Sequence, residues 1–494
     1  MAPLMLVPRA CRGNETHECP PSNTRTRATL QPLMAPNPTH AGHAHAAYGS
    51  SRGEPWHECS DCGLVQRIDV LRPGEVATCM RCNFVLRRRQ RDSLSTALAL
   101  AIAGFILMIV VAAEPLMLFR LTGQERQTTM FGLPQAFSDQ GMPLPELAVA
   151  FTTLLAPALR LGLTAAVLAG LRLRVPRALL AGMARVREWL QPWAMVEVFL
   201  LGLFVAYTRL AALSEVHIEL AVYALVALML FTASADAWLD EVAMWDAIGR
   251  HGPPLPESEG SQTIACDTCG LINHCQEGDP CPRCDTALEH RKRNPLARCC
   301  ALVVTGAVLY IPANLYPVLT VVRLGRGAPS TILGGVVELA QASMYPLALL
   351  VLVASIVVPS FKLVGLVYLL VTTWCRSPHH LIGRTRLYRI IDFIGRWSMI
   401  DVFMAGILTA LVRMGMIGSV TPGLGVQFFC AVVIITMIAV MMFDPRVMWD
   451  AAGQNGTIPA SQGRTSRLPA PPPPTSPPPT SQPPLGETEG VVPA

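Results

Sequence analysis

The sequence predicts an all-α polytopic membrane protein made of two tandem repeats, each a cytoplasmic four-cysteine ribbon followed by four transmembrane helices. The 494-residue chain is 51% hydrophobic and 15% charged, with a mean hydropathy of +0.40, which is too apolar for an ordinary soluble protein. Eight long apolar runs cross the sequence, and a cluster of paired cysteines precedes the first and the fifth run. These three observations set the fold class.

Each apolar run is roughly 20 residues or longer, the length that a helix needs to cross a bilayer core about 30 Å thick. Buried helices of a large soluble core would instead show runs of about 10–14 residues with a polar face. The run "STALALAIAGFILMIVVAA", which begins at Ser95, has no such face. We therefore predict spans near residues 94–118, 147–171, 193–213, 218–238, 299–320, 346–374, 398–418 and 424–443.

Basic residues are concentrated in alternate connections. Four or five Arg and Lys residues lie before span 1, between spans 2 and 3 (172–191), before span 5, and between spans 6 and 7 (375–396), whereas the other loops carry one or two. By the positive-inside rule the basic connections are cytoplasmic, so both termini and both ribbons are expected inside. The first 90 residues lack the apolar region of a signal peptide. The net charge of +5 therefore reflects topology and does not indicate nucleic-acid binding.

The cysteine clusters have the spacing of metal-binding ribbons. Each contains two Cys-x-x-Cys pairs, separated by 16 residues in the first cluster and 11 in the second, and a glycine, Gly63 or Gly270, follows the first pair. Four thiolates at such spacing bind structural zinc, and the reducing cytoplasm disfavours disulfides. A rubredoxin-type iron site has the same spacing, whereas thioredoxin-like chemistry needs one pair in a βαβ context. We expect two Zn²⁺ ions per chain and no catalytic metal, with the ligands Cys59, Cys62, Cys79, Cys82, Cys266, Cys269, Cys281 and Cys284.

Aligning the two clusters reveals an internal repeat. "APALRLGL" (156–163) matches "VPSFKLVGL" (358–366), "QPWAMVEVFLLG" (191–202) matches "GRWSMIDVFMAG" (395–406), and "VAMWDAIG" (242–249) matches "RVMWDAAG" (446–453). Each copy has four spans, an even number, so the two copies have parallel topology and an axis along the membrane normal.

The repeat defines six regions. We expect a disordered leader at 1–54 and a disordered Pro-rich tail at 454–494, which contains "PAPPPPTSPPPTSQPPL". Between them lie two zinc ribbons and two four-helix membrane modules, at 55–88, 92–250, 262–290 and 295–453.

Charged residues recur at equivalent positions within the predicted spans, where charge is costly and commonly functional. Arg160 and Lys362 each follow a proline by three residues, and each proline frees the carbonyl four residues earlier, at Thr153 or Ser355. We therefore expect a kink, a free carbonyl, a hydroxyl and a cation on neighbouring turns of each module. The alternative, without a functional role, is that the long cationic side chains extend to the membrane–water interface.

Two acids form a second equivalent pair. Glu197 and Asp401 lie one turn into spans 3 and 7, after Trp193 and Trp397. They are candidate titrating groups of a transport pathway. A carboxylate in the first turn is also favoured by the helix dipole alone.

Together, the paired ribbons and the segments "PWAMVEVF", "RWSMIDVF", "IPANLYPVL" (311–319) and "FDPRVMWD" (443–450) resemble the paraquat-inducible protein A family over residues 56–453. The first module departs from the second, with "VAAEPLMLF" (111–119) in place of "IPANLYPVL". The resemblance implies an inner-membrane partner of MCE-domain proteins, which form periplasmic tunnels, and a role in moving lipid between the envelope membranes and maintaining envelope integrity.

Two other functions fit the same sequence. One is a transporter of a small amphipathic solute without an MCE partner, and the other is a metal- or redox-responsive membrane sensor. A sensor predicts that the ribbon thiols respond to oxidant while the interior charges are dispensable; a transporter predicts the reverse. The sequence has no G-x-x-x-x-G-K-[ST] motif, so we expect neither nucleotide binding nor an enzymatic activity.

Overall fold

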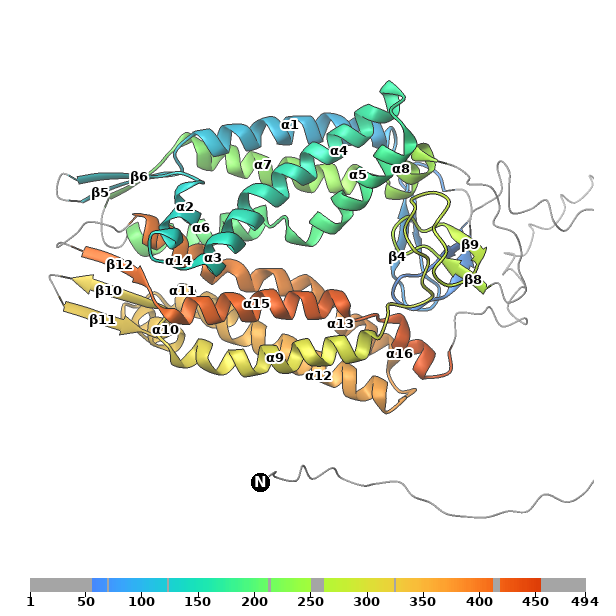
Figure 1. The fold of residues 1–494 in the computed structure, drawn as a ribbon. Helices are drawn as coiled ribbons and strands as arrows, with labels where there is room; N and C mark the ends of the chain where they lie inside the picture. Colours follow the sequence, from blue (N-terminus) through green and yellow to red (C-terminus); the bar gives the residue numbers. More distant parts are fainter. Residues whose placement is uncertain are drawn as a thin grey trace, which may run out of the picture. The chain divides into compact units, whose positions relative to one another are not determined.

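The computed structural model describes residues 56–68, 71–121, 124–211, 215–249, 262–323, 326–411 and 418–454. The predicted leader and all but the first residue of the predicted tail lie outside these ranges. The described part contains two membrane halves, which we call half 1 (93–248) and half 2 (295–451), and two ribbons (Figure 1).

Half 1 consists of helices joined by short turns and one small sheet. Its helices are α1 (Ser93–Ala113), α2 (Gly132–Ser138), α3 (Pro143–Val149), α4 (Ala156–Leu173), α5 (Arg177–Leu190), α6 (Val196–Ala211), α7 (Leu220–Trp238) and α8 (Glu241–Ile248). A π-helical segment η1 (Ala150–Leu155) joins α3 to α4, and a 3₁₀ turn η2 (Gln191–Trp193) joins α5 to α6.

Half 2 repeats this order. Its helices are α9 (Pro295–Leu315), α10 (Ile332–Gln341), α11 (Tyr345–Leu352), α12 (Val358–Trp374), α13 (Leu381–Gly395), α14 (Ile400–Leu411), α15 (Leu424–Met442) and α16 (Arg446–Ala451). The π-helical segment η3 (Val353–Val357) and the 3₁₀ turn η4 (Arg396–Met399) occupy the places of η1 and η2.

Eight helical segments of the described chain are long and apolar enough to cross a membrane, which confirms the predicted multi-pass class. Two of them begin earlier than expected, at Arg177 and Leu381, because the predicted loops 172–191 and 375–396 contain the helices α5 and α13. One face of α5 buries Leu180, Ala181 and Ala184. This apolar face packs on α4 and stabilises a segment whose charge content indicated a loop.

The prolines deform their helices as expected, and the deformation takes the form of a π-helical turn. In η1 and η3 the last amide, at Ala156 or Val358, bonds five residues back to Phe151 or Val353. Proline removes one donor of the α-helical ladder, and the wider π turn re-pairs the neighbouring groups.

Each half also contains an antiparallel three-stranded sheet that the helical periodicity did not predict. In half 1 the order is β6-β5-β7, with β5 at Met117–Leu121, β6 at Gln124–Thr128 and β7 at Glu215–Ile218. In half 2 it is β11-β10-β12, with β10 at Leu319–Arg323, β11 at Arg326–Ser330 and β12 at Gly418–Pro422. Strands this short carry too little alternation to separate them from the apolar runs that they continue.

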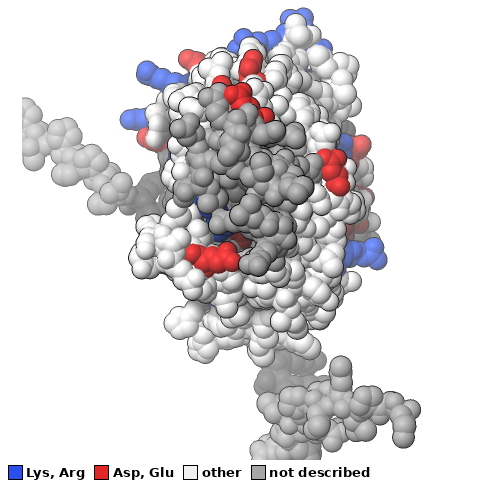
Figure 2. Space-filling view, turned by 90° about the vertical axis from the view of Figure 1, so that its left-hand side faces the viewer, with Lys and Arg blue, Asp and Glu red and all other residues white. Residues whose placement is uncertain are grey.

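The sheets lie at the end of the helices opposite the ribbons (Figure 1). Viewed from the sheet end, the described surface is mostly uncharged, and most of the Lys and Arg side chains that show lie near its outline (Figure 2). The orientation of the chain in the membrane stays a prediction of the positive-inside rule.

The two ribbons are built from short hairpins. The first contains β1 (Trp56–Glu58) paired with β2 (Val65–Arg67) and β3 (Val76–Thr78) paired with β4 (Val85–Arg88). The second contains β8 (Gln262–Ala265) paired with β9 (Ile272–Cys275) and a bridge between Pro280 and Ala287.

Each ribbon packs against the membrane half of the other repeat. The four cysteines of the first ribbon share a buried cluster with Val303 of α9, Leu366 of α12 and Trp449 of α16. Those of the second ribbon share one with Val167 of α4 and Trp245 of α8. The ribbons are therefore exchanged between the two halves.

Two equivalent arginines, one in each ribbon, contact the membrane half of the opposite repeat. Arg81 lies between the last two cysteines of the first ribbon, and its guanidinium lies 5.1 Å from the centre of the Trp449 ring. Arg283, at the equivalent position of the second ribbon, pairs with Asp246 of α8 at 3.2 Å. Trp449 belongs to half 2 and Asp246 to half 1, so each arginine contacts the opposite repeat.

Candidate functional site

Two clusters of four cysteines are assembled as the sequence predicts. In each cluster all four cysteines are buried and unpaired by disulfides, and their Sγ atoms lie within 4.8 Å of one another. The Cys59–Cys82 and Cys62–Cys79 sulfurs are 3.5 Å apart. Sulfurs in a tetrahedral site with Zn–S bonds of about 2.3 Å would be about 3.8 Å apart, so the donor set fits a tetrahedral metal ion.

The four knuckles have one backbone design. After each Cys-x-x-Cys pair the chain enters a left-handed conformation, at Gly63 (φ 70°), Asn83 (56°), Gly270 (68°) and Asp285 (61°). The amide of each of these residues donates to the carbonyl of the first cysteine of its pair, at 2.8–2.9 Å. Glycine, asparagine and aspartate tolerate this conformation best, which is why these residues follow the pairs.

The thiols must lose their protons to become metal ligands, and a bound cation favours that loss. Hydrogen bonds with the thiols of Cys62, Cys79 and Cys82, together with burial, raise the pKa of Cys59. Four adjacent thiolates would repel one another, and a divalent metal offsets that repulsion. The cluster could supply a closed structural site, with no position open to a substrate.

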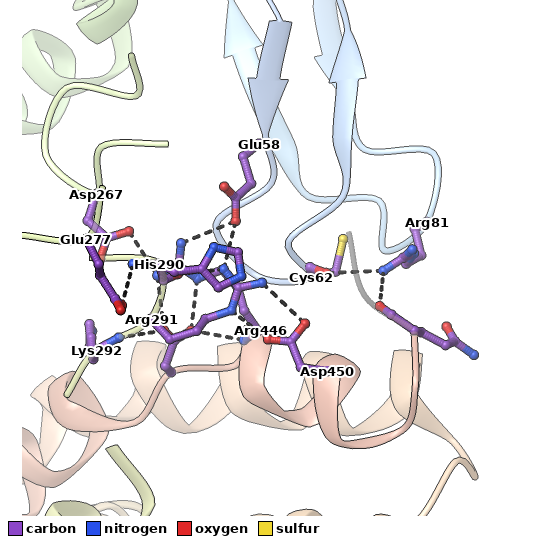
Figure 3. A network of polar contacts seen from close by, with 12 residues as sticks. Glu58, Cys62, Arg81, Asp267, Glu277, His290, Arg291, Lys292, Arg446 and Asp450 are labelled. Atoms are coloured by element: carbon purple, nitrogen blue, oxygen red, sulfur yellow. Dashed lines mark hydrogen bonds and ion pairs between the residues drawn. The ribbon is translucent and has the colours of Figure 1, made fainter. Parts of the chain in front are cut away.

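Arg446 of α16 joins both ribbons to half 2 (Figure 3). Its guanidinium lies 3.4 Å from Glu58 of the first ribbon, 2.9 Å from Asp267 of the second and 3.0 Å from Asp444. Arg291 adds a second link, 3.2 Å from Glu58 and 2.6 Å from Asp450. Buried Arg446 and Glu58, together with their more exposed partners, link the ribbons to half 2 through charges of opposite sign.

Within half 1 the predicted cation Arg160 has a partner that the sequence analysis did not identify. Its Nη2 donates to Asp236 of α7 at 2.6 Å, and its buried Nε has no hydrogen-bond partner in the described part of the chain. Glu197 lines the same small pocket. Its exposed carboxylate forms no ion pair with Arg160 or with any other described residue. The structure thus brings Arg160 and Glu197 to one pocket and adds Asp236 to its lining.

A large apolar groove begins at Glu197. It has a volume of about 530 Å³, its lining is almost wholly apolar, and Trp397 of half 2 closes one side. The residues from half 1 that line it are Met117, Leu200, Leu201, Leu203, Phe204, Tyr207, Ile218, Val222, Val226 and Met229. Glu197 lines both spaces, so the groove and the Arg160 pocket adjoin at this residue.

The second predicted cation lies between the two halves. Lys362 is fully buried, and its Nζ donates to the carbonyl of Gly395 at 3.3 Å. It lines a cavity of about 230 Å³ together with Asp392 and with Glu188 of half 1. A lysine that is buried away from solvent needs such carboxylates nearby to remain charged.

An apolar cavity adjoins this polar one. It has a volume of about 290 Å³, is lined by Phe151, Trp189 and Trp193 of half 1 and by residues of half 2, and shares Met437 with the Lys362 cavity. The boundary between the halves therefore contains a polar compartment beside an apolar one.

Asp401 is buried, unlike its repeat-equivalent Glu197. Among the residues that the structure describes, neither of its carboxylate oxygens has a hydrogen-bond partner. It faces a cavity of about 60 Å³ that is also lined by Arg209 of half 1 and by Glu338 and Ser355. The two equivalent acids consequently have different environments: Glu197 is exposed at an apolar groove, and Asp401 is buried beside a small cavity that Arg209 and Glu338 also line.

The predicted hydroxyls bond within their own helices. Thr153 donates to the carbonyl of Val149 at 2.8 Å, and Ser355 donates to that of Val351 at 2.6 Å. Since a hydroxyl has one hydrogen, Ser355 cannot also donate to Asp401 in this arrangement.

Five charged residues of these cavities were not singled out from the sequence. Asp236 and Arg209 lie inside predicted spans, so the cost of intramembrane charge was the signal available for them. Glu188 and Asp392 stand at equivalent positions of the repeat, five residues before Trp193 and Trp397, and the alignment could have found both. Nothing in the sequence marks Glu338.

The chain matches the family model for paraquat-inducible protein A twice, at residues 94–249 and 296–453. It is 33% identical over 406 residues to the intermembrane transport protein PqiA of Escherichia coli K12, an alignment that covers 79% of this chain and 95% of that protein. It is 28% identical over 401 residues to the lipophilic envelope-spanning tunnel protein A of the same strain, covering 81% and 92%. No solved structure matches the chain.

Proposed function

The chain belongs to the paraquat-inducible protein A family, and from this membership we propose that it is an integral inner-membrane component of an intermembrane lipid-transport system. In this proposal it hands lipid to or from a periplasmic tunnel of MCE-domain proteins and so supports envelope integrity. The names of its relatives support a role in transport between membranes. The MCE partner and the inner-membrane location rest on the family resemblance.

One observation carries the lipid assignment: the apolar groove of half 1 shares Glu197 with a charged pocket. A lipid has the same division, with an apolar tail and a polar headgroup. The groove would receive an acyl chain, and Arg160, Asp236 and Glu197 would face the headgroup. The apolar and polar compartments at the boundary of the halves, joined at Met437, offer a second space of the same kind.

The polar ends of these spaces would decide which lipid binds. Bilayer tails are as apolar as the groove, so moving an acyl chain into the groove gains little free energy. Hydrogen bonds to the headgroup are the larger source of selectivity. The unpartnered Nε of Arg160 suits a phosphate oxygen, and the free carboxylate of Glu197 suits a headgroup ammonium.

We further propose that the interior charges take part in transport. Lys362 and Asp401 are buried in half 2 where charge is expensive. Asp401 and Glu197 are the candidate titrating groups. Ser355, in a deformed helix, lines the same cavity as Asp401, and Thr153 holds the equivalent position in half 1. Movement of an ion down its gradient could then drive the lipid, without an enzymatic step in this chain.

The ribbons complete the proposal as structural parts. Each would hold one Zn²⁺ through four thiolates and would face the cytoplasm together with both termini. The sheets at the other end would then lie in the periplasm, where the MCE partner docks.

A photo-crosslinking amino acid tests both halves of this proposal in intact cells. Placed at Leu200 in the groove, it should capture a phospholipid; placed at the exposed Gln127 of β6, it should capture an MCE-domain protein. The matched control is Trp374, which is exposed at the end of α12, outside both sites. Capture of lipid at Trp374 as strong as at Leu200 would leave the groove as ordinary lipid-facing surface. Capture of a small solute and no lipid at Leu200 would favour the small-solute transporter.

A further inference from the structure

The environments of the two thiolate clusters differ in one contact. Arg389 of α13 reaches into the first ribbon, where its Nη2 lies 3.2 Å from the Cys82 sulfur and donates to the Cys82 carbonyl at 3.1 Å. Its Nε donates to Asp61 at 2.5 Å, and its guanidinium lies 5.2 Å from the centre of the Phe84 ring. One cation of half 2 is thus held by four groups of the first ribbon.

The second cluster lacks this partner. The residue equivalent to Arg389 is Arg185 of α5, and among the described residues no hydrogen bond or ion pair joins Arg185 to the second ribbon; its Nε is buried without a partner. The sulfur of Cys284 contacts the hydroxyl of Thr286 instead, at 3.3 Å.

Two sequence differences accompany this asymmetry: Thr286 stands where the first ribbon has Phe84, and the anchoring carboxylate is absent. Asp61 stands just before the second cysteine of the first ribbon, and Thr268 stands at that position in the second. Arg389 therefore has a carboxylate to anchor it beside the cluster, whereas Arg185 has none.

The contact has an electrostatic consequence. Four thiolates around a divalent ion leave a net charge of −2, and a guanidinium beside one sulfur stabilises that charge. Partners behind the ligands commonly change metal affinity by about 10–100-fold. The hydroxyl of Thr286 carries no charge, so it stabilises the charge of the second cluster less than Arg389 stabilises the charge of the first.

The same arginine connects the first cluster to the membrane. Three residues further along α13, Asp392 lines the Lys362 cavity, and α13 ends at Gly395, whose carbonyl accepts from Lys362. We propose that the two metal sites are not equivalent: Arg389 locks the first ribbon's metal to α13 of half 2, so this metal is held more tightly, and its removal loosens α13. Arg389 is a positioning residue in this proposal, acting through Cys82 and Asp61.

The inference rests on the proposed metal content and is independent of lipid transport. The test uses the full chain in detergent, beginning with the zinc content. Two zinc ions per chain are required, and a different total counts against the metal assignment itself. Release to a chelator is then followed with a chromogenic zinc indicator, and two phases of equal amplitude are expected.

The variants assign the phases. Arg389→Met should speed the slow phase about tenfold or more, Arg389→Lys should recover part of the loss because it keeps the charge, and Arg185→Met is the matched control that should change neither phase. Asp61→Thr, which introduces the residue found in the second ribbon, should speed the slow phase as Arg389→Met does. This variant replaces Arg389→Met in the test if Arg389→Met folds poorly. A single release rate for both ions, or equal effects of Arg389→Met and Arg185→Met, would overturn the proposal.

Hydrogen exchange supplies a readout on the membrane side. In Arg389→Met, and in wild type after the slow zinc is removed, the amides of residues 381–395 should exchange faster, while those of residues 177–190 in α5 keep their wild-type rates. Unchanged exchange in α13 after loss of the slow zinc would refute the link between the metal and the membrane half.

Discussion

The rings of Phe199 and Phe403 meet edge to face, with centroids 5.7 Å apart and an interplanar angle of 84°. The two residues occupy the same position of the repeat, on α6 and α14, so the two halves meet through equivalent side chains. Gly202, also on α6, faces the same contact: a Cβ added there would lie 3.1 Å from the Cβ of Phe403. Small residues permit such close approach between membrane helices, where packing supplies much of the attraction.

This contact predicts that Gly202→Val loosens the association of the halves. Overpacking of this kind costs about 1–3 kcal/mol, so the midpoint of thermal unfolding in detergent should fall by several degrees. Gly182→Val is the control, because a Cβ at Gly182 meets nothing within 4 Å. Equal midpoints for the two variants would show that the α6–α14 contact tolerates separation.

Metal content should follow the cluster residues and no other cysteine of the ribbon. Cys281→Ser should lose one zinc per chain and destabilise the second ribbon, because structural zinc supplies about 10–16 kcal/mol of apparent binding free energy in isolated finger peptides. Cys275→Ser, also a buried cysteine of that ribbon, should retain two. Elemental analysis decides the matter; iron in place of zinc would correct the identity of the metal.

The orientation predicts which thiols are reachable from outside the cell. A cysteine at Gln127, at the sheet end, should react with a membrane-impermeant maleimide in intact spheroplasts. The native Cys375 is exposed at the other end, after α12, and should react only after permeabilisation. Labelling in the reverse order would invert the proposed topology.

Replacing the interior lysine should separate function from stability. Lys362→Met removes a fully buried charge, breaks no ion pair among the described residues and keeps an apolar side chain of similar length, so the unfolding midpoint should stay the same or rise. Transport-dependent resistance to membrane stress should nevertheless be lost. If activity and stability fell together, a structural role for the charge would explain both results.

The same replacement at Arg160 tests the pocket of half 1. Arg160→Met leaves Asp236 without its partner, but that carboxylate is 41% exposed, so the cost in stability should be small. Arg172→Met, at an exposed position of the same helix, controls for the loss of positive charge. Full activity in a folded Arg160→Met, Lys362→Met double variant would contradict a role for these cations in transport.

The sequence predicted the spans and the thiolate clusters because each depends on short-range patterns. A bilayer fixes the length of an apolar run, and a tetrahedral ion fixes the spacing of cysteines around a turn. Both signals survive in a single sequence without knowledge of the packing.

The partners of the charged residues depend on packing and were not predictable in this way. Asp236 meets Arg160 only because α7 lies beside α4, and Glu197 and Asp401 have different burial because the helices around them pack differently in the two halves. The exchange of the ribbons was hidden for the same reason, since sequence proximity suggested that each ribbon serves the half that follows it.

The exchanged ribbons impose an order on biosynthesis. Trp449, against which the first ribbon packs, lies 367 residues after Cys82, so at about 5–20 residues per second the ribosome takes roughly 20–70 s to supply it. During that interval the first ribbon has folded without its docking surface, whereas the second ribbon meets a surface that is already made. A chaperone or a trapping peptide that recognises Arg81 and Phe84 would therefore bind the nascent chain better than the finished protein, in which both side chains are partly covered.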